Sequence, residues 1–129
     1  MLTFRYTILY VQDVSKALSF YEKAFGLERG MLHESGDYGE LVTGTTKLAF
    51  SSMDLMHQLG KSPRAANPSA PSFEIAFETT RVSDALQQAV EAGAELVQEV
   101  QNMPWGQQTA YVRDLDGFLI EICSPVGSG

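Results

Sequence analysis

An internal repeat is the feature that most constrains how this chain folds. The segment Val14–Leu18 (VSKAL) recurs 68 residues later as Val82–Leu86 (VSDAL), which is about half of the 129-residue chain. Each copy follows an apolar-rich segment of strand character, residues 6–11 in the first case and 74–79 in the second. A repeat at this spacing predicts two similar modules, each built on the same supersecondary pattern.

Each copy of the repeat begins an amphipathic helix. In the first copy, apolar residues follow the helical period over 14–25, and Asp13 is a good N-cap residue. Gly26 is placed to end this helix in the left-handed conformation. In the second copy, Gly93 ends the helix, but Arg81 stands where Asp13 stands in the first. Because an arginine cannot cap, we expect Thr80 to serve instead.

Three further segments of strand character follow each helix. They span about 28–34, 38–43 and 46–52 in the first half, and about 95–100, 108–113 and 118–123 in the second. Between the halves, the Pro-, Ala-, Ser- and Asn-rich stretch 60–71 predicts a surface linker. The sequence therefore predicts an α+β fold in one domain over 1–129, with two tandem βαβββ modules at about 2–52 and 72–126.

A single βαβββ module has one helix to cover a four-stranded sheet, so one sheet face stays open. Two modules side by side predict a curved, mixed sheet of eight strands that surrounds a cleft for a small ligand.

The composition excludes several classes of partner. Nine Lys plus Arg stand against sixteen Asp plus Glu, a net charge of −7, which disfavours binding to nucleic acid or to an anionic membrane surface. No apolar stretch approaches a membrane span, and the N-terminal residues have no signal-peptide pattern. The single cysteine, Cys123, lies in an apolar run and is interpreted as a buried residue. We therefore expect a cytoplasmic protein.

The ordered motifs of the two halves resemble the vicinal oxygen chelate superfamily, the group of glyoxalases, bleomycin resistance proteins and extradiol dioxygenases. The resemblance covers about residues 4–124, and the following segments carry it: VQDV at 11–14, SFY at 19–21, GL at 26–27, IAF at 75–77, AGA at 92–94 and DLDGFLIE at 114–121. Pro104-Trp105-Gly106 is similar to a loop of the bleomycin-resistance-like members, in which an aromatic residue lies over the ligand. The pattern is closest to that of these members.

The resemblance implies four metal-ligand positions, two in each module. They fall on Tyr6, Glu74 and Glu121 and, when Gly44–Leu48 is aligned with Gly117–Glu121, on Leu48. Leucine cannot ligate a metal and neutral tyrosine ligates poorly, whereas catalytic sites for divalent metals need about three protein ligands. We therefore expect no resident cofactor. If a divalent metal binds, Glu74 and Glu121 would hold it.

Three hypotheses for function follow from the resemblance. The first is a small-molecule-binding protein that takes an aromatic or cationic compound, with the ligand residues Tyr6, Leu48, Phe50, Glu74, Trp105 and Glu121. The second is a metal-dependent lyase or isomerase resembling glyoxalase I, with Glu74 and Glu121 as catalytic candidates. The third is a purely structural or regulatory dimer whose cleft binds no ligand and is empty, which a pocket filled by the side chains of Tyr6, Leu48 and Trp105 would favour. Whether the protein is an enzyme is left open. A homodimer is expected in each case.

Overall fold

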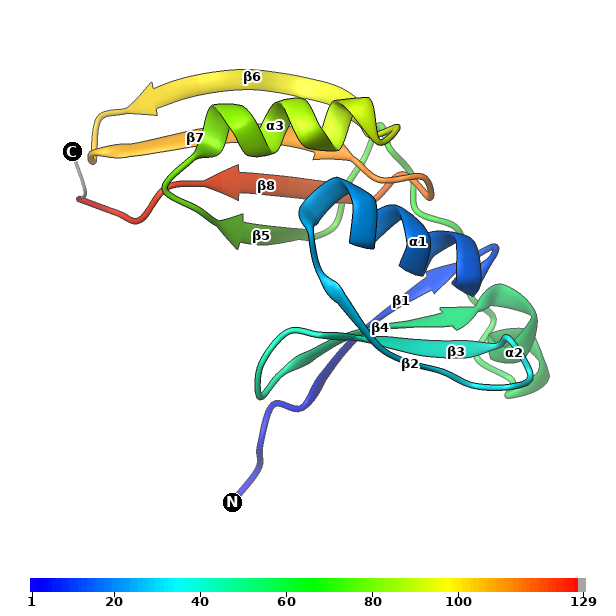
Figure 1. Ribbon diagram of the computed structural model, residues 1–129. Coiled ribbons are helices and arrows are strands. Elements are labelled where there is room, and N and C mark those ends of the chain that lie inside the picture. The colour runs from blue at the N-terminus through cyan, green and yellow to red at the C-terminus, as the bar shows by residue number, and fades with distance from the viewer. Residues whose placement is uncertain (128–129) are drawn as a thin grey trace. The chain divides into compact units, whose positions relative to one another are not determined.

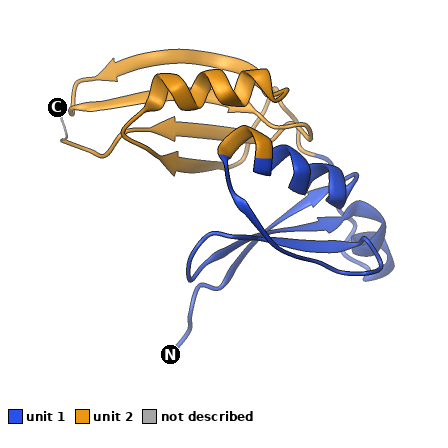
Figure 2. Ribbon diagram, viewed as in Figure 1, with its two compact units in different colours: residues 1–22, 26–65 blue, residues 23–25, 66–129 orange. Residues whose placement is uncertain are grey.

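The structure, a computed structural model, describes residues 1–127 and divides into two compact units (Figures 1 and 2). Unit 1 comprises residues 1–22 and 26–65. Unit 2 comprises residues 23–25 and the chain from residue 66 onward. Each unit contains one four-stranded sheet, and the two sheets have the same topology. The prediction of an α+β fold with two tandem modules is therefore confirmed.

Unit 1 follows the predicted order of elements. Its strands and helices are β1 (Tyr6–Val11), α1 (Val14–Phe25), β2 (Glu28–Leu32), β3 (Tyr38–Val42), β4 (Lys47–Ser52) and α2 (Met53–Gln58). The strand order across the sheet is β1-β4-β3-β2, with β1 parallel to β4 and the other pairs antiparallel. A parallel pair needs a crossover connection, which α1, β2 and β3 supply together.

Helix α1 packs closely on one face of the unit 1 sheet. Tyr21 and Phe50, both almost fully buried, place their ring centroids 5.0 Å apart. A Cβ atom added to Gly39 would lie 2.6 Å from Leu18 Cδ1 and 3.2 Å from Val14 Cγ1. The helix therefore approaches the sheet closely at Gly39, and a side chain there would crowd the apolar stripe of α1.

Unit 2 repeats the arrangement with β5 (Glu74–Glu78), α3 (Val82–Glu91), β6 (Glu95–Met103), β7 (Gln107–Arg113) and β8 (Leu119–Cys123). The strand order is β5-β8-β7-β6, and β5 is parallel to β8. Helix α3 contacts β6, β7 and β8 and lies over one face of this sheet (Figure 1). The core between them contains Ala110, Val112, Ile120 and Ile122, none more than 1% exposed.

The first helix begins and ends where the sequence predicts. The Asp13 side chain accepts a hydrogen bond from the Lys16 backbone nitrogen at 3.0 Å, and Gly26 ends the helix in the left-handed conformation with φ of 68°. The expectation for the second helix was wrong at its start. Thr80 does not cap it. Instead, Thr79 Oγ1 accepts from the Arg81 nitrogen, and Arg81 itself occupies the N-cap position without a side-chain cap.

Two further differences from the predicted elements lie at segment ends. The short helix α2 was not predicted, although Ser52 caps it by accepting from the Leu55 nitrogen at 3.0 Å. Strand β6 extends to Met103, beyond the predicted end at residue 100, because it pairs with β7 up to the turn that carries Trp105. In the described chain, no helix has both the length and the apolar character that a membrane span requires.

Candidate functional site

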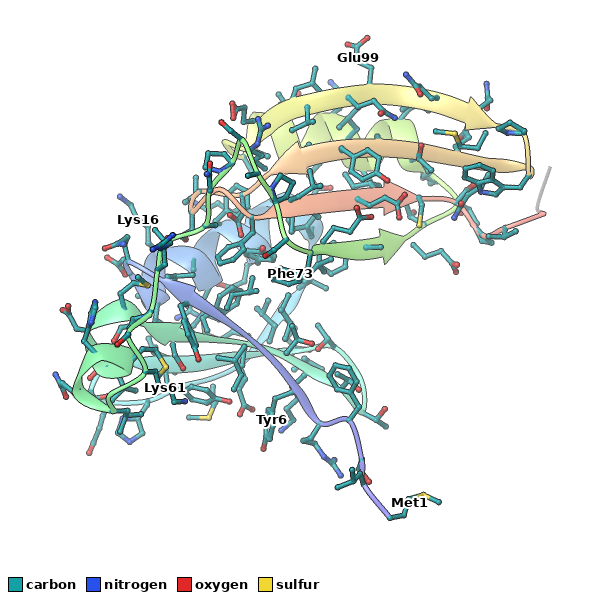
Figure 3. The ribbon with its side chains drawn as sticks, turned by 180° about the vertical axis from the view of Figure 1, so that it is seen from behind. Met1, Tyr6, Lys16, Lys61, Phe73 and Glu99 are labelled. Carbon is teal, nitrogen blue, oxygen red and sulfur yellow. The ribbon has the colours of Figure 1, made fainter. Side chains whose placement is uncertain are left out.

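The sheet of unit 2 has one face covered by α3 and one face without a helix. Figure 1 shows the face with the helix, and Figure 3, turned by 180°, shows the opposite face. Side chains alternate between the two faces of a strand. Since the buried core residues of β7 and β8 lie under α3, the residues between them lie on the opposite face. We call this the helix-free face of unit 2. It carries Glu74, Glu78, Thr109, Tyr111, Arg113, Glu121 and Cys123.

A tyrosine and a carboxylate lie side by side at the middle of this face. Tyr111 and Glu121 are directly opposite each other on β7 and β8, and the Tyr111 hydroxyl donates a hydrogen bond to Glu121 Oε2 at 2.8 Å. Burial, and then the hydrogen bond to Glu121, raise the pKa of Tyr111 well above its usual value. The tyrosine therefore stays protonated and donates to the carboxylate at every physiological pH.

The helix-free face of unit 2 is acidic. Glu74 lies on β5 two residues before Ala76, the register partner of Glu121, so both carboxylates point to the same side of adjacent strands. Glu78 follows on the same strand and face. The cation of this face, Arg113, is already engaged: its Nη1 lies 3.0 Å from Glu95 Oε1, and its Nε donates to the Pro68 carbonyl oxygen.

Trp105 stands at the end of the same sheet, in the turn between β6 and β7. Its indole Nε1–H donates to Gln107 Oε1 at 2.7 Å, and Gln107 Nε2 donates in turn to the Ser124 carbonyl oxygen at 2.9 Å. Trp105 as a residue is nevertheless 56% exposed. An aromatic side chain that is fixed at its polar edge and exposed on its face is well placed to stack against a planar ligand.

Cys123 is buried, as the sequence predicted. Burial, followed by the nearby Glu121 carboxylate, raises the pKa of the thiol. It therefore stays protonated at neutral pH and is a poor nucleophile.

The helix-free face of unit 1, defined as the sheet face turned away from α1, has a similar buried carboxylate. Glu40 is 9% exposed, accepts a hydrogen bond from the Tyr38 hydroxyl at 2.8 Å through Oε2, and lies 3.2 Å from Lys47 Nζ through Oε1. Burial is the main cause that raises the pKa of Tyr38, and the hydrogen bond to Glu40 is the second. Both oxygens of Glu40 are thus already bound within the unit.

The strand register changes which residue of β4 matches Glu121. Tyr6 pairs with Lys47 on the parallel strand, as Glu74 pairs with Leu119, so Ala49 corresponds to Glu121. The glycine alignment assigned this position to Leu48, one residue too early. Because adjacent residues of a strand face opposite sides, Leu48 lies with Phe50 on the face that packs under α1. Tyr6, 47% exposed, lies on the helix-free face of unit 1.

The residues at the four implied ligand positions do not fit a resident divalent metal. With the corrected register they are Tyr6, Ala49, Glu74 and Glu121, and an alanine has no donor atom. Glu121 already accepts the Tyr111 hydroxyl. Within the described residues, no group of three or more His, Cys, Asp and Glu side chains is arranged to hold a metal ion.

Other polar residues singled out in the sequence have local roles. His33 Nδ1 lies 2.8 Å from Ser35 Oγ in the turn between β2 and β3, and His57 lies in α2. Asp114 Oδ1 accepts from the Asp116 and Phe118 nitrogens, which closes the turn before β8.

Sequence reasoning missed Tyr111, Tyr38, Glu40 and Lys47. These residues alternate with apolar residues on β3, β4 and β7. Because every second residue of a strand faces away from the helix, this alternation could have predicted that they lie on the helix-free faces.

The chain belongs to the family of glyoxalase-like domains, whose sequence pattern matches residues 4–127. No curated protein matches the chain in sequence.

Solved structures of the glyoxalase, bleomycin resistance protein and dioxygenase superfamily share its fold. A glyoxalase-related enzyme from Fulvimarina pelagi is 21% identical, with a TM-score of 0.83 over 99% of this chain and 94% of its own. A family enzyme from Burkholderia phytofirmans PsJN is 19% identical, with a TM-score of 0.81 over 95% and 98%. A protein of this group from Nocardioides is 18% identical, with a TM-score of 0.78 over 100% and 87%.

Proposed function

We propose that this glyoxalase-like domain is a small-molecule-binding protein of the bleomycin-resistance type, which takes a cationic aromatic compound on the helix-free face of unit 2. The acidity of that face carries the proposal. Glu74, Glu78 and Glu121 share one sheet face on which Arg113 is bound to Glu95. Such a face attracts a cation and repels an anion, and the effect weakens as salt increases.

Trp105 supports the aromatic part of the proposal. It is the chain's single tryptophan, and its indole is largely exposed while its N–H is bound to Gln107. A tryptophan face is the best protein surface for a cation or a flat ring, and its fluorescence reports directly on whatever stacks against it.

Isosteric probes of opposite charge test the proposal. Benzamidinium is expected to quench Trp105 fluorescence in a saturable titration, and benzoate is expected to have no such effect. Glu78 pairs with Cys123 at the end of the sheet where Trp105 lies, whereas Glu74 pairs with Leu119 at the other end. The double substitution Glu78→Gln and Glu121→Gln removes the two carboxylates nearer to Trp105 without changing their size, so it is expected to weaken benzamidinium binding by about tenfold or more. Glu34→Gln, an exposed carboxylate of unit 1, is the matched control and is expected to bind as the parent does.

Two outcomes would contradict the proposal. One is benzamidinium affinity that is equal in the parent and the double variant. The other is benzoate binding as tightly as benzamidinium at low salt, because an acidic face cannot favour an anion.

A further inference from the structure

A concave site lies at one end of the unit 2 sheet. It is a cavity of about 360 Å³ at the ends of four strands, in the size range of small-molecule sites. The side chains that line it come from the segment after β5, the end of β6, the start of β7 and the residue after β8: Thr80, Asn102, Met103, Gln107, Gln108 and Ser124. None of the carboxylates of the acidic helix-free face lines this cavity.

The lining carries no charged side chain. Its side chains are amides and hydroxyls with one thioether, from Met103, and more of the exposed wall is apolar than polar. Such a wall differs from the helix-free face of unit 2, which is acidic. An ion on this wall would find no opposite charge, whereas a neutral molecule with a ring and one polar group would match both the apolar surface and the amides.

The hydrogen bonds within the lining show which atoms remain for a ligand. Gln107 is used at both ends, by Trp105 and by the Ser124 carbonyl. Ser124 Oγ accepts from the Gln108 nitrogen, which leaves its own hydrogen to donate. Gln108 Nε2 reaches Asn102 Oδ1 at 3.4 Å, so the amide nitrogen of Asn102 and the amide oxygen of Gln108 make no bond within the described chain.

A donor and an acceptor on neighbouring side chains are complementary to a carboxamide, which offers one of each. Met103 adds an apolar, polarisable surface of the kind that packs against a ring. We propose that this cavity is a binding site for a neutral aromatic carboxamide, held through Asn102 and Gln108. Gln107 joins this cavity to Trp105 of the proposed cation site, but no carboxylate lines it. Variants of the carboxylates and variants of the cavity wall therefore show separately which of the two proposals fails.

Benzamide, benzamidinium and benzoate differ mainly in charge and therefore test the proposal directly. In two-dimensional NMR of the whole chain, benzamide is expected to shift the side-chain amide signals of Asn102 and Gln108 in a saturable way. It is expected to bind this cavity about tenfold or more tightly than either ion. Shifts of these signals by benzamidinium or benzoate at equal affinity would overturn the proposal.

Filling the cavity supplies the second test. Thr80 is exposed and makes no hydrogen bond within the described chain, so Thr80→Phe adds bulk at the wall without removing a contact. It is expected to abolish the benzamide shifts, while Thr45→Phe, at an exposed threonine of the β3–β4 turn, leaves them intact. Benzamide binding that survives Thr80→Phe unchanged would place the ligand elsewhere and overturn the proposal.

A reversed preference between benzamide and benzamidinium is the most specific test, because a misfolded variant would lose binding of both ligands and could not reverse their order. Asn102→Asp keeps the shape of the side chain and introduces one negative charge into the neutral wall. The variant is expected to reverse the preference, so that benzamidinium binds the cavity more tightly than benzamide. If the variant folds as the parent does and the preference stays unchanged, Asn102 does not contact the ligand and the proposal is wrong.

Discussion

Two tyrosine–carboxylate pairs occupy equivalent faces of the two units, Tyr38 with Glu40 and Tyr111 with Glu121. In both pairs, burial is the main cause of a tyrosine pKa above the usual value of 10.0, and the hydrogen bond to the glutamate is the second. Each hydrogen bond needs a protonated tyrosine as its donor. We therefore expect the stability of the fold to decrease at alkaline pH, where the tyrosines lose their protons.

The sign of this pH dependence follows from linkage. A group whose folded-state pKa is raised contributes stability that is complete below its unfolded pKa and is lost as the pH rises through the folded pKa. We therefore expect the urea midpoint to be constant from pH 7 to about pH 9 and to fall above about pH 10. Equilibrium unfolding across this range measures it. A midpoint that does not fall above pH 10 would contradict the raised pKa values.

The double substitution Tyr38→Phe and Tyr111→Phe is the control for the alkaline prediction. It removes both titrating groups and keeps both rings, so the part of the alkaline decrease that these tyrosines cause is expected to disappear. Absorbance near 295 nm, which follows tyrosinate formation, is expected to show less tyrosine that ionises at high pH in the double variant than in the parent.

Asp114 is a second residue whose effect can be predicted. It is 6% exposed, and its Oδ1 accepts hydrogen bonds from the backbone nitrogens of Asp116 and Phe118. Asp114→Ala leaves both donors without their acceptor and is expected to lower the free energy of unfolding by about 1–3 kcal/mol. Asp114→Asn keeps an acceptor oxygen and is expected to recover part of the loss. Urea unfolding of the two variants checks this, and equal stability of both would contradict it.

At the scale of elements, α1 and β3 approach each other closely at Gly39. A Cβ atom there would lie 2.6 Å from Leu18 Cδ1 and 3.2 Å from the Met31 carbonyl oxygen, so the buried Leu18 side chain would have to move and the β2 backbone would have to yield slightly. Gly39→Ala is expected to destabilise the protein by about 1–3 kcal/mol in urea unfolding. Val42→Ala, on the same strand but half-exposed, is the control and is expected to change stability by about 0.5 kcal/mol or less. Equal effects would contradict the close approach.

The elements themselves were largely predictable because each carries its own local signal. The repeated helices have a 3.6-residue period, and Asp13 and Gly26 mark the ends of the first. The start of the second helix was not predictable in the same way, because two adjacent threonines could each serve as its cap. Neither threonine caps the helix: Thr79 Oγ1 accepts from the nitrogen of Arg81, and Arg81 occupies the N-cap position without a side-chain cap.

The site was less predictable, because strand faces depend on register. Aligning two glycines across modules is accurate only when the turns have equal lengths, and an error of one residue moved the assignment from Ala49 to Leu48. Phe50, expected among the ligand-binding residues as an aromatic side chain, packs on Tyr21 in the core. Tyr111, which binds Glu121, and Lys47, which binds Glu40, lie on neighbouring strands, and such pairing is not contained in the sequence of any single strand.

At the scale of the whole molecule, homodimer formation stays a prediction from the family resemblance, as does the cleft between modules. Light scattering coupled to gel filtration is expected to give twice the 14.2 kDa mass of one chain at micromolar concentration. The mass of a single chain at that concentration would contradict the prediction.

Metal content is also a property of the whole molecule, because the four implied ligand positions are divided between the two units. Two of them, Ala49 and Tyr6, offer at best one weak donor, and a stable divalent site needs about three good ones. We therefore expect protein purified without chelator to contain far less than one equivalent of zinc, nickel, manganese or iron. EDTA is expected to change neither its melting temperature nor its affinity for benzamidinium. If the protein contained one equivalent of metal, and Glu74→Gln with Glu121→Gln removed it, the lyase or isomerase hypothesis would replace the binding protein proposed above.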